Sequence, residues 1–233
     1  MAEKLKVVFP LYEGSTLLDF AGATQVFAFA GFAPVWAAAC LDPITTTENV
    51  QVLPGDTFDA VRQKGAAEIL FVPGGGGRVG EVMQDATMIG FVRDVGRQAR
   101  YAGSVCSGAF LLAAAGLFDG CEVTTYWSQR ENLALFPNLR LAAGYPRWVI
   151  HGNRFSGGGV SSSIDLALEL VSLISGPTQS MSTQLSIQYA PGPPYTSGDP
   201  SQAPPEITSS VRADQEDFTA TIRLAVEKVL GKS

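Results

Sequence analysis

One short stretch, residues 101–112, constrains this chain most, because it joins a buried strand directly to a helix. Its first half predicts the strand, and the small apolar residues from Ser107 onward predict the helix. Cys106 stands at the joint, where a tight strand-to-helix turn aims a side chain out of the sheet, as in a nucleophile elbow. Gly108 supplies a small residue where helix and strand crowd. Ser104 replaces the usual glycine, so the pattern is S-x-C-x-G.

The chemistry expected of Cys106 follows from its position. A thiol at the start of a helix meets free backbone N–H groups and the positive end of the helix dipole, and both favour the thiolate. The stretch therefore predicts a nucleophile, and a buried structural cysteine is the alternative. The other two cysteines, Cys40 and Cys121, are widely spaced. An odd number of scattered cysteines predicts neither a disulfide framework nor a metal ribbon.

Strands alternate with helices along the chain. Buried strands are predicted at 4–9, 34–39 and 67–72, and helices at 17–30, 86–100 and 164–174. This alternation predicts an α/β sandwich with a mostly parallel sheet. Ligands gather beyond the carboxyl ends of the strands in such a sheet, so we expect Asp19, in the first turn of the first helix, near Cys106. A helix-capping acid is the alternative role for Asp19.

The predicted strand 67–72 ends in a run of glycines, Pro73-Gly74-Gly75-Gly76-Gly77. Gly75, Gly77 and Gly80 spell G-x-G-x-x-G. As a dinucleotide fingerprint this is weak, because the unit is not the first βα unit and no acidic residue ends a strand about 20 residues on. Close approach of the backbone to a small substrate or to the elbow explains the glycines better.

Composition limits the kinds of partner that the protein can bind and the compartment in which it is expected. The chain has 233 residues and a net charge of −6, so no basic patch attracts nucleic acid. No run of about 18 apolar residues predicts a membrane span. The opening residues Met1-Ala2-Glu3-Lys4 lack the long apolar core of a signal peptide. We therefore expect one cytoplasmic domain, 1–233, with no nucleic-acid or membrane partner.

A single histidine, His151, limits the chemistry. The strands expected at 145–150 and 154–156 place it with Gly152 and Asn153 in a hairpin turn. Cys–His hydrolases need an imidazole within hydrogen-bond reach of the thiol, so a peptidase or amidase of that type is disfavoured. One histidine and no thiolate cluster predict no metal site, and we expect no cofactor.

A proline-rich arm at 190–205 precedes the C-terminal segment. Its prolines lack the donors that a helix or a central strand needs. One amphipathic helix over about 206–230 is predicted by apolar residues at helical spacing, namely Val211, Phe218, Ile222, Ala225 and Val229. An extended arm gains little by packing on its own domain but can lie across a neighbour. We therefore expect a symmetric homodimer.

Three motifs together resemble the ThiJ/PfpI superfamily: Pro73-Gly74-Gly75, the elbow Ser104-Val105-Cys106-Ser107-Gly108-Ala109, and Thr124-Thr125-x-Trp127. The resemblance extends from Val7 to the last helix. Within that superfamily, two further segments are similar to bacterial isocyanide hydratases: Phe155-x-Gly157-Gly158-Gly159 and Gln188-Tyr189-Ala190-Pro191-x-Pro193-Pro194-Tyr195.

The resemblance implies a flavodoxin-like three-layer sandwich with a cysteine on the elbow and an acid from the first helix beside the thiol. Asp19 matches that acid, which gives Cys106 and Asp19 the catalytic roles. Ser107 stands where threonine or histidine is usual, so it keeps a hydroxyl but cannot act as a base. Tyr126 replaces the histidine of the usual Thr-Thr-His-Trp.

The function implied is that of an isocyanide hydratase, which adds water to a small isocyanide and releases an N-substituted formamide. Candidates for binding the substrate or its developing charge are Gly75, Ser107, Tyr126, Trp127 and Gly158. Two other functions stay open. One is a redox or stress-response protein with an oxidisable thiolate. The other is a non-catalytic small-molecule binding module, which the expected lack of a DNA-binding extension disfavours as a regulator.

Overall fold

A computed structural model describes residues 4–65 and 67–232. Residues 1–3, which carry the expectation about a signal peptide, lie outside the described part. The central sheet has seven strands in the order β10-β11-β7-β6-β1-β2-β5. Its strands are β1 (Lys6–Pro10), β2 (Ala33–Ala38), β5 (Asp56–Thr57), β6 (Ile69–Val72), β7 (Tyr101–Val105), β10 (Trp148–His151) and β11 (Arg154–Gly157).

The sheet is parallel except at one edge, where β10 pairs antiparallel with β11. Read from β2 to β11, its strands follow the 2-1-3-4-5 order of flavodoxin-like folds. The strands that cross the centre, such as β6, are buried on both faces and consist of apolar residues. That burial is what helices on both sides of a parallel sheet require. The predicted three-layer α/β class is confirmed.

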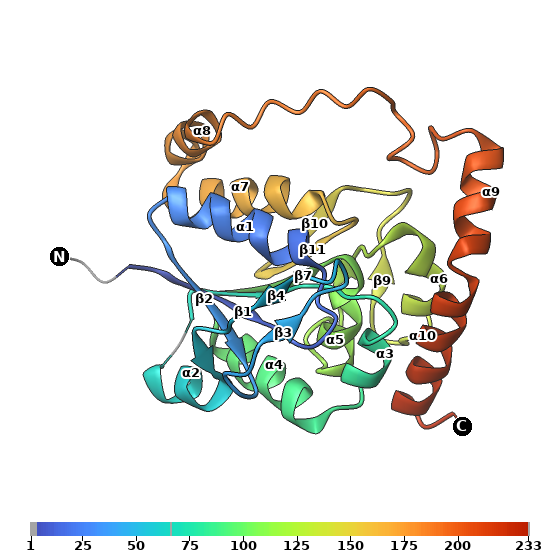
Figure 1. The fold of residues 1–233 in the computed structure, drawn as a ribbon, viewed down its shortest axis with the longest axis horizontal. Coiled ribbons are helices and arrows are strands. Elements are labelled where there is room, and N and C mark those ends of the chain that lie inside the picture. The colour runs from blue at the N-terminus through green and yellow to red at the C-terminus, as the bar shows by residue number, and fades with distance from the viewer. Residues whose placement is uncertain (1–3, 66, 233) are drawn as a thin grey trace.

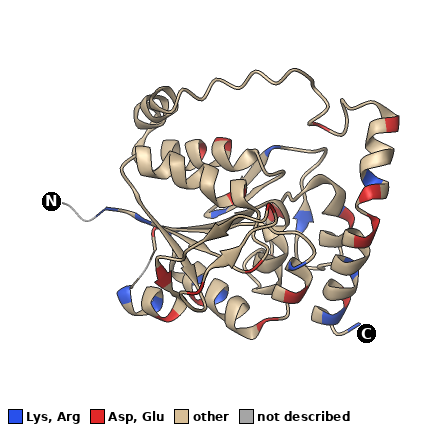
Figure 2. Cartoon of the chain, in the orientation of Figure 1, with Lys and Arg blue, Asp and Glu red and all other residues tan. Residues whose placement is uncertain are grey.

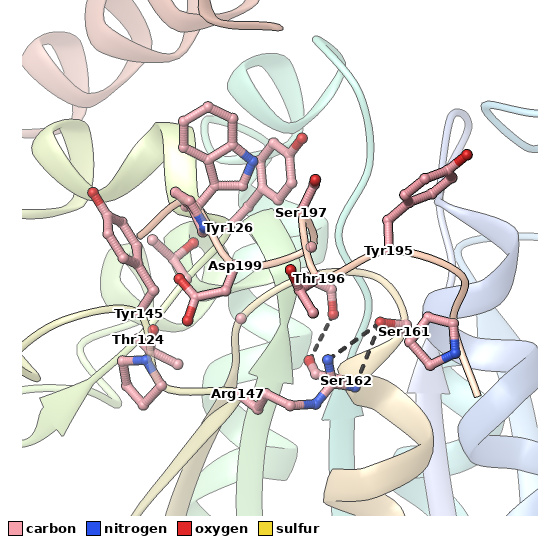
Figure 3. Close-up of a pocket in the computed structure, with 18 residues that line it drawn as sticks. Thr124, Tyr126, Tyr145, Arg147, Ser161, Ser162, Tyr195, Thr196, Ser197 and Asp199 are labelled. Atoms are coloured by element: carbon pink, nitrogen blue, oxygen red, sulfur yellow. Dashed lines mark hydrogen bonds between the residues drawn. The ribbon is translucent and has the colours of Figure 1, made fainter. Parts of the chain in front are cut away.

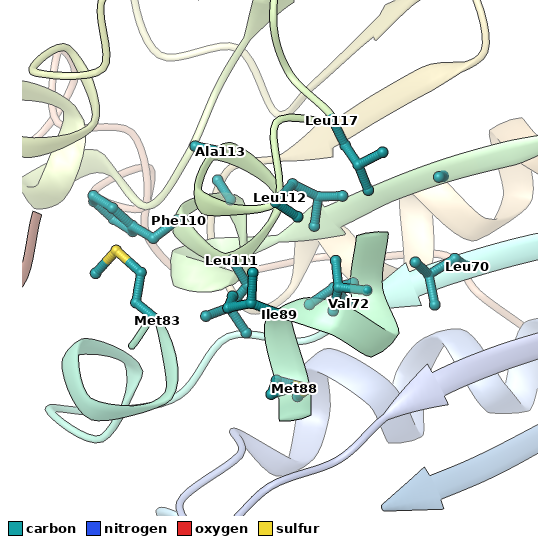
Figure 4. Close-up of a cluster of buried hydrophobic side chains, with 14 of the residues drawn as sticks. Leu70, Val72, Met83, Met88, Ile89, Phe110, Leu111, Leu112, Ala113 and Leu117 are labelled. Atoms are coloured by element: carbon teal, nitrogen blue, oxygen red, sulfur yellow. The ribbon is translucent and has the colours of Figure 1, made fainter. Parts of the chain in front are cut away.

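Helices cover both faces of the sheet (Figure 1). One face carries α1 (Leu17–Phe29) and α7 (Ser162–Ser175), which pack on each other and on Phe9 and Phe71. The other face carries α2 (Phe58–Lys64), α4 (Ala86–Gln98) and α5 (Ala109–Ala114). There Leu70 and Val72 of β6 lie among Ile89, Leu111 and Leu112 (Figure 4). The two cores fix the sheet edge at which the loops after β1, β6 and β7 meet.

Several short elements depart from the sequence prediction. The β structure expected within 45–53 is a hairpin of β3 (Ile44–Thr45) and β4 (Gln51–Val52). The helix α2 was not predicted, although Thr57 caps it by accepting a hydrogen bond from the N–H of Ala60. The remaining short elements are α3 (Val79–Val82), α6 (Arg130–Leu133), β8 (Glu122–Val123) and β9 (Arg140–Leu141).

The C-terminal part differs from the single helix predicted for 206–230. It forms two helices, α9 (Pro205–Asp214) and α10 (Glu216–Val229), which meet at Gln215. Ile222, Ala225 and Val226 of α10 are buried against the core, whereas α9 buries no residue. The apolar spacing correctly predicted the buried face of α10. The same spacing continues through α9, but no residue of α9 is buried. The arm runs in extended form from α8 (Pro177–Ser186) to α9 (Figure 1).

Charged residues of both signs are interspersed over α2, α4 and the C-terminal helices (Figure 2). By contrast, α8 carries no charged residue, and the arm carries only Asp199. None of the described helices combines the length and apolar character that crossing a bilayer requires.

Candidate active site

The strand-to-helix joint has the geometry of a nucleophile elbow. Cys106 follows β7 with a φ of +56°, in the left-handed region that non-glycine residues seldom occupy. Holding a residue there costs about 1–3 kcal/mol, so the surroundings must enforce it. Two contacts do so. The hydroxyl of Thr125 donates to the Cys106 carbonyl at 2.9 Å, and any Cβ on Gly108 would lie 2.5 Å from the Val72 carbonyl oxygen.

Asp19 is fully buried in the first turn of α1. Its Oδ2 accepts a hydrogen bond from the N–H of Gly74 at 2.7 Å. Its Oδ1 has no hydrogen-bond partner among the described residues. A Cβ on Gly74 would lie 2.9 Å from Asp19 Oδ2 and 2.7 Å from Ser107 Oγ, so only glycine fits there. The loops after β1, β6 and β7 therefore meet around this carboxyl.

Ser107 and Gly75 bind each other reciprocally. The Ser107 hydroxyl donates to the Gly75 carbonyl at 2.8 Å, and the Gly75 N–H donates to Ser107 Oγ at 3.1 Å. The Gly75 N–H is thus engaged, and the glycine loop locks the residue that follows Cys106. Backbone approach to the elbow, expected from the glycine run, is what the loop provides.

Burial controls the protonation of the two candidate catalytic groups. Burial, together with the charge of Glu48 and against the opposing effect of the Gly74 N–H, raises the pKa of Asp19 to about 8. Burial and the nearby Asp19 carboxyl raise the pKa of the Cys106 thiol well above its usual range, although the N–H and hydroxyl of Ser107 oppose this. This direction opposes the thiolate expected from the helix terminus. The pair resists holding even one negative charge, and two are excluded.

Tyr12 is a site residue that the sequence interpretation missed. It lies in the loop after β1, is 8% exposed, and donates from its hydroxyl to the Pro73 carbonyl at 3.2 Å. Burial and the charges of Asp19 and Cys106 raise the pKa of its hydroxyl. It therefore stays neutral and lies close to the carboxyl and the thiol. Its position three residues before Ser15, in a loop without a motif, gave no signal.

His151 lies at the opposite end of the sheet from the elbow. It is the last residue of β10, not a turn residue as predicted, and it pairs with Arg154. Arg154 in turn pairs with Ala102 at the start of β7. Four residues of extended strand, about 13 Å, separate that level from Cys106. The His151 Nδ1 accepts from the N–H of Glu122 at 3.4 Å, so the imidazole is unable to serve the thiol.

The remaining predicted residues line a cavity of about 630 Å³ beside the elbow (Figure 3). Tyr126, Trp127 and Gly158 belong to its wall, and Thr125 links it to Cys106. Part of the arm, Pro193 and residues 195–200, lines the same cavity. The arm was expected to lie across a neighbour, and in the single chain it already borders this cavity. Cys106 is 6% exposed, and neither Cys106 nor Asp19 belongs to the wall of this cavity.

The described residues include no group of three or more His, Cys, Asp or Glu side chains that could hold a metal ion. Cys40 is exposed and Cys121 is buried, and neither belongs to the elbow site. The chemistry at this edge of the sheet therefore centres on the thiol, the carboxyl and the hydroxyls around them.

A three-layer α/β sandwich with a cysteine elbow and a buried carboxyl beside it defines a class of protein. The profile of the DJ-1/PfpI family matches residues 5–173 of this chain. The chain belongs to the DJ-1/PfpI family.

Individual relatives refine that assignment. The isonitrile hydratase of Pseudomonas putida is 36% identical over 211 residues, which cover 89% of each chain. The crystal structure of a ThiJ/PfpI family protein from Pseudomonas syringae superposes with a TM-score of 0.89 at 29% identity, covering 96% of this chain and 90% of that one. The transcriptional regulator GbdR of Pseudomonas aeruginosa is 29% identical over 172 residues. The matched segment covers 70% of this chain and 45% of the regulator.

Proposed function

We propose that this protein is an isocyanide hydratase, which converts R–N≡C and water into R–NH–CHO. The observation that carries the proposal is the buried pair of Cys106 and Asp19, in which the carboxyl keeps a proton near neutral pH because its pKa is about 8. A nucleophile beside a neutral acid suits an addition that needs both an attacking sulfur and a proton.

The resting pair holds two protons, and the reaction proceeds through its minor form with one proton, in which Cys106 is a thiolate and Asp19 is the acid. The sulfur forms a bond to the terminal carbon of the isocyanide. Asp19 gives its proton to the same carbon, and the product is a thioimidate, Cys106–S–CH=N–R. The negative charge moves from sulfur to Asp19, so the site carries one charge throughout.

In the second step, the Asp19 carboxylate removes a proton from water as the hydroxyl adds to the thioimidate carbon. Asp19 passes that proton to nitrogen. The tetrahedral adduct collapses: its hydroxyl proton returns to Asp19, the C=O bond forms, and the C–S bond breaks. The formamide leaves and Cys106 is again a thiolate. No amine departs, so one carboxyl suffices for every proton transfer.

The other predicted residues have supporting roles in this proposal. Ser107, fixed by Gly75, directs its N–H toward the sulfur and offsets part of its charge. Tyr126, Trp127 and Gly158 shape the cavity that takes the R group. The isocyanide carbon and nitrogen form a linear group, which suits a nearly closed thiol. The similarity to the hydratase of Pseudomonas putida supports the same chemistry.

The decisive test supplies an aryl isocyanide and follows formamide by NMR. We expect Cys106→Ala to lose at least about a thousandfold in rate, equal to about 4 kcal/mol of barrier. Asp19→Asn should lose about 10²- to 10⁴-fold, the usual value of a positioned acid or base. His151→Ala is the matched control and should keep the parent rate, because His151 lies at the far end of the sheet.

Formamide production by Cys106→Ala at the parent rate would overturn the proposal. A tenfold loss in His151→Ala would overturn the assignment of all proton transfers to Asp19. Mass spectrometry of the quenched reaction should show the thioimidate on the peptide that carries Cys106.

A redox or stress-response protein is the alternative function. Drosophila melanogaster DJ-1beta shares the fold, with a TM-score of 0.73 at 19% identity. A redox role for Cys106 needs a readily formed thiolate. Burial opposes that here, because it raises the thiol pKa. Peroxide treatment that oxidises Cys106 before the exposed Cys40 would favour the redox function.

A further inference from the structure

We propose that Glu48, at the turn of the β3–β4 hairpin, is a positioning residue that keeps the Asp19 carboxyl protonated. Its catalytic value rests on the proposed function, since that reaction needs Asp19 as an acid. The proposal itself concerns the proton on Asp19 and is testable without any isocyanide.

The β3–β4 hairpin is fastened to the loop that leads into α1. The N–H of Gly14 donates to the Thr45 carbonyl at 2.8 Å, and the N–H of Thr47 donates to the Ser15 carbonyl at 3.2 Å. A carboxylate oxygen of Glu13 also accepts from the N–H of Thr45 at 3.0 Å. The hairpin therefore holds a fixed position over the first turn of α1.

From that position Glu48 caps α1. Its Oε2 accepts from the N–H of Leu17, the first residue of the helix, at 3.0 Å. Thr16, the N-cap residue, makes no side-chain cap of its own. The start of a helix carries partial positive charge, which on its own would favour an ionised Asp19 two residues further on. A carboxylate placed on that end cancels the effect, so the helix start no longer draws the proton from Asp19.

Glu48 itself remains ionised. Burial would raise its pKa, but the N–H of Leu17 and the hydroxyls of Thr47 and Thr46 outweigh burial and lower it. Two groups act on Asp19 from neighbouring elements: the charge of Glu48 raises its pKa, and the N–H of Gly74 lowers it. The charge of Asp19 in turn raises the pKa of Tyr12 and of Cys106, so neither of these neighbours supplies a positive charge. Arg78, the cation beside this loop, is paired with Glu81 at 2.7 Å.

The experiment follows the C=O infrared band of protonated Asp19 against pH, with aspartate selectively labelled with ¹³C so that Glu48 does not contribute. Asp19→Asn assigns the band by removing it. In the parent protein the midpoint should lie near pH 8. In Glu48→Gln the midpoint should fall by about 0.5 pH unit, the size expected for loss of one charge across a partly solvated gap.

The glutamine variant keeps an oxygen that accepts from Leu17, so a purely structural cap would leave the midpoint unchanged, and that result would overturn the proposal. Glu13→Gln is the matched control. It removes a carboxylate that binds the same hairpin but not α1, and its midpoint should match that of the parent. Glu48→Asp keeps the negative charge on a shorter side chain, so its midpoint should lie between that of Glu48→Gln and that of the parent. If formamide assays fail while the midpoint still moves, only the proposed function is lost.

Discussion

For Asp19 and Cys106, the sequence predicts the position of each residue but not its charge. Their proximity followed from the order of strands and helices, because both lie beyond the carboxyl ends of parallel strands. Their charge did not follow, since it depends on burial by residues distant in sequence. Burial raises the pKa of both groups, which opposes the thiolate predicted from the helix terminus.

The raised pKa of Asp19 makes the stability of the protein depend on pH. Unfolded, the carboxyl titrates near its ordinary pKa of about 3.9, whereas the folded protein holds the proton to about pH 8. The stabilisation from this proton is complete below about pH 4 and is lost as pH rises toward 8. The neutral amide of Asp19→Asn has no such loss.

We therefore predict that Asp19→Asn gains stability relative to the parent as pH rises. Urea unfolding at pH 5, 6, 7 and 8 should show the difference in free energy of unfolding widening in favour of the variant at each step. A difference that stays constant over this range would show that Asp19 does not hold a proton in the folded state.

At the scale of elements, the C-terminal helices hold two side chains of the cavity wall from behind. Gln215, at the junction of α9 and α10, donates from Nε2 to the Tyr126 hydroxyl at 2.8 Å. The guanidinium of Arg212 lies 4.9 Å from the centre of the Trp127 ring. Residues nearly ninety positions apart thus fix the two aromatic side chains that follow Thr125. The interruption between α9 and α10 places Gln215 where it meets Tyr126.

We predict that Tyr126 and Gln215 act as one unit in substrate binding. Tyr126→Phe and Gln215→Met each remove the shared hydrogen bond, worth about 0.5–1.5 kcal/mol, and should raise KM about three- to tenfold with a smaller change in kcat. The double variant should be no worse than either single variant, because both lose the same contact. Additive losses would show that the two side chains act separately.

Elements differ in how much the sequence reveals of them. The strands of the sheet centre and α4 were predictable, because their apolar patterns are strong and their ends carry clear signals. The break at Gln215 was not predictable, since apolar spacing continues across it, whereas α10 packs on α3 and α6, which no local pattern encodes. Tyr12 and Glu48 escaped for a similar reason, because docking of the β3–β4 hairpin is a tertiary event that no local pattern encodes.

At the scale of the whole molecule, α8 and the arm expose large apolar side chains in the single chain. Met181 and Leu185 of α8 are 61% and 80% exposed, and Tyr195 of the arm is 79% exposed. The same region has almost no charged residues, in contrast to the remaining surface (Figure 2). Exposed apolar surface of this kind, on a segment that crosses the molecule in extended form, is typical of an interface.

We predict that two copies of the chain associate symmetrically through α8 and the arm. A stable interface of ordinary size removes about 1,600 Å² from water, and the apolar side chains of this face supply its centre. Sedimentation equilibrium at micromolar protein should give twice the chain mass of 24.6 kDa. Leu185→Asp should shift the equilibrium toward the monomer, because it places a charge at the apolar centre. Leu224→Asp is the matched control, since Leu224 is 60% exposed on α10, away from this face. A parent protein that sediments as a monomer at every concentration would contradict the dimer. The arm would then serve only to line the cavity of its own chain.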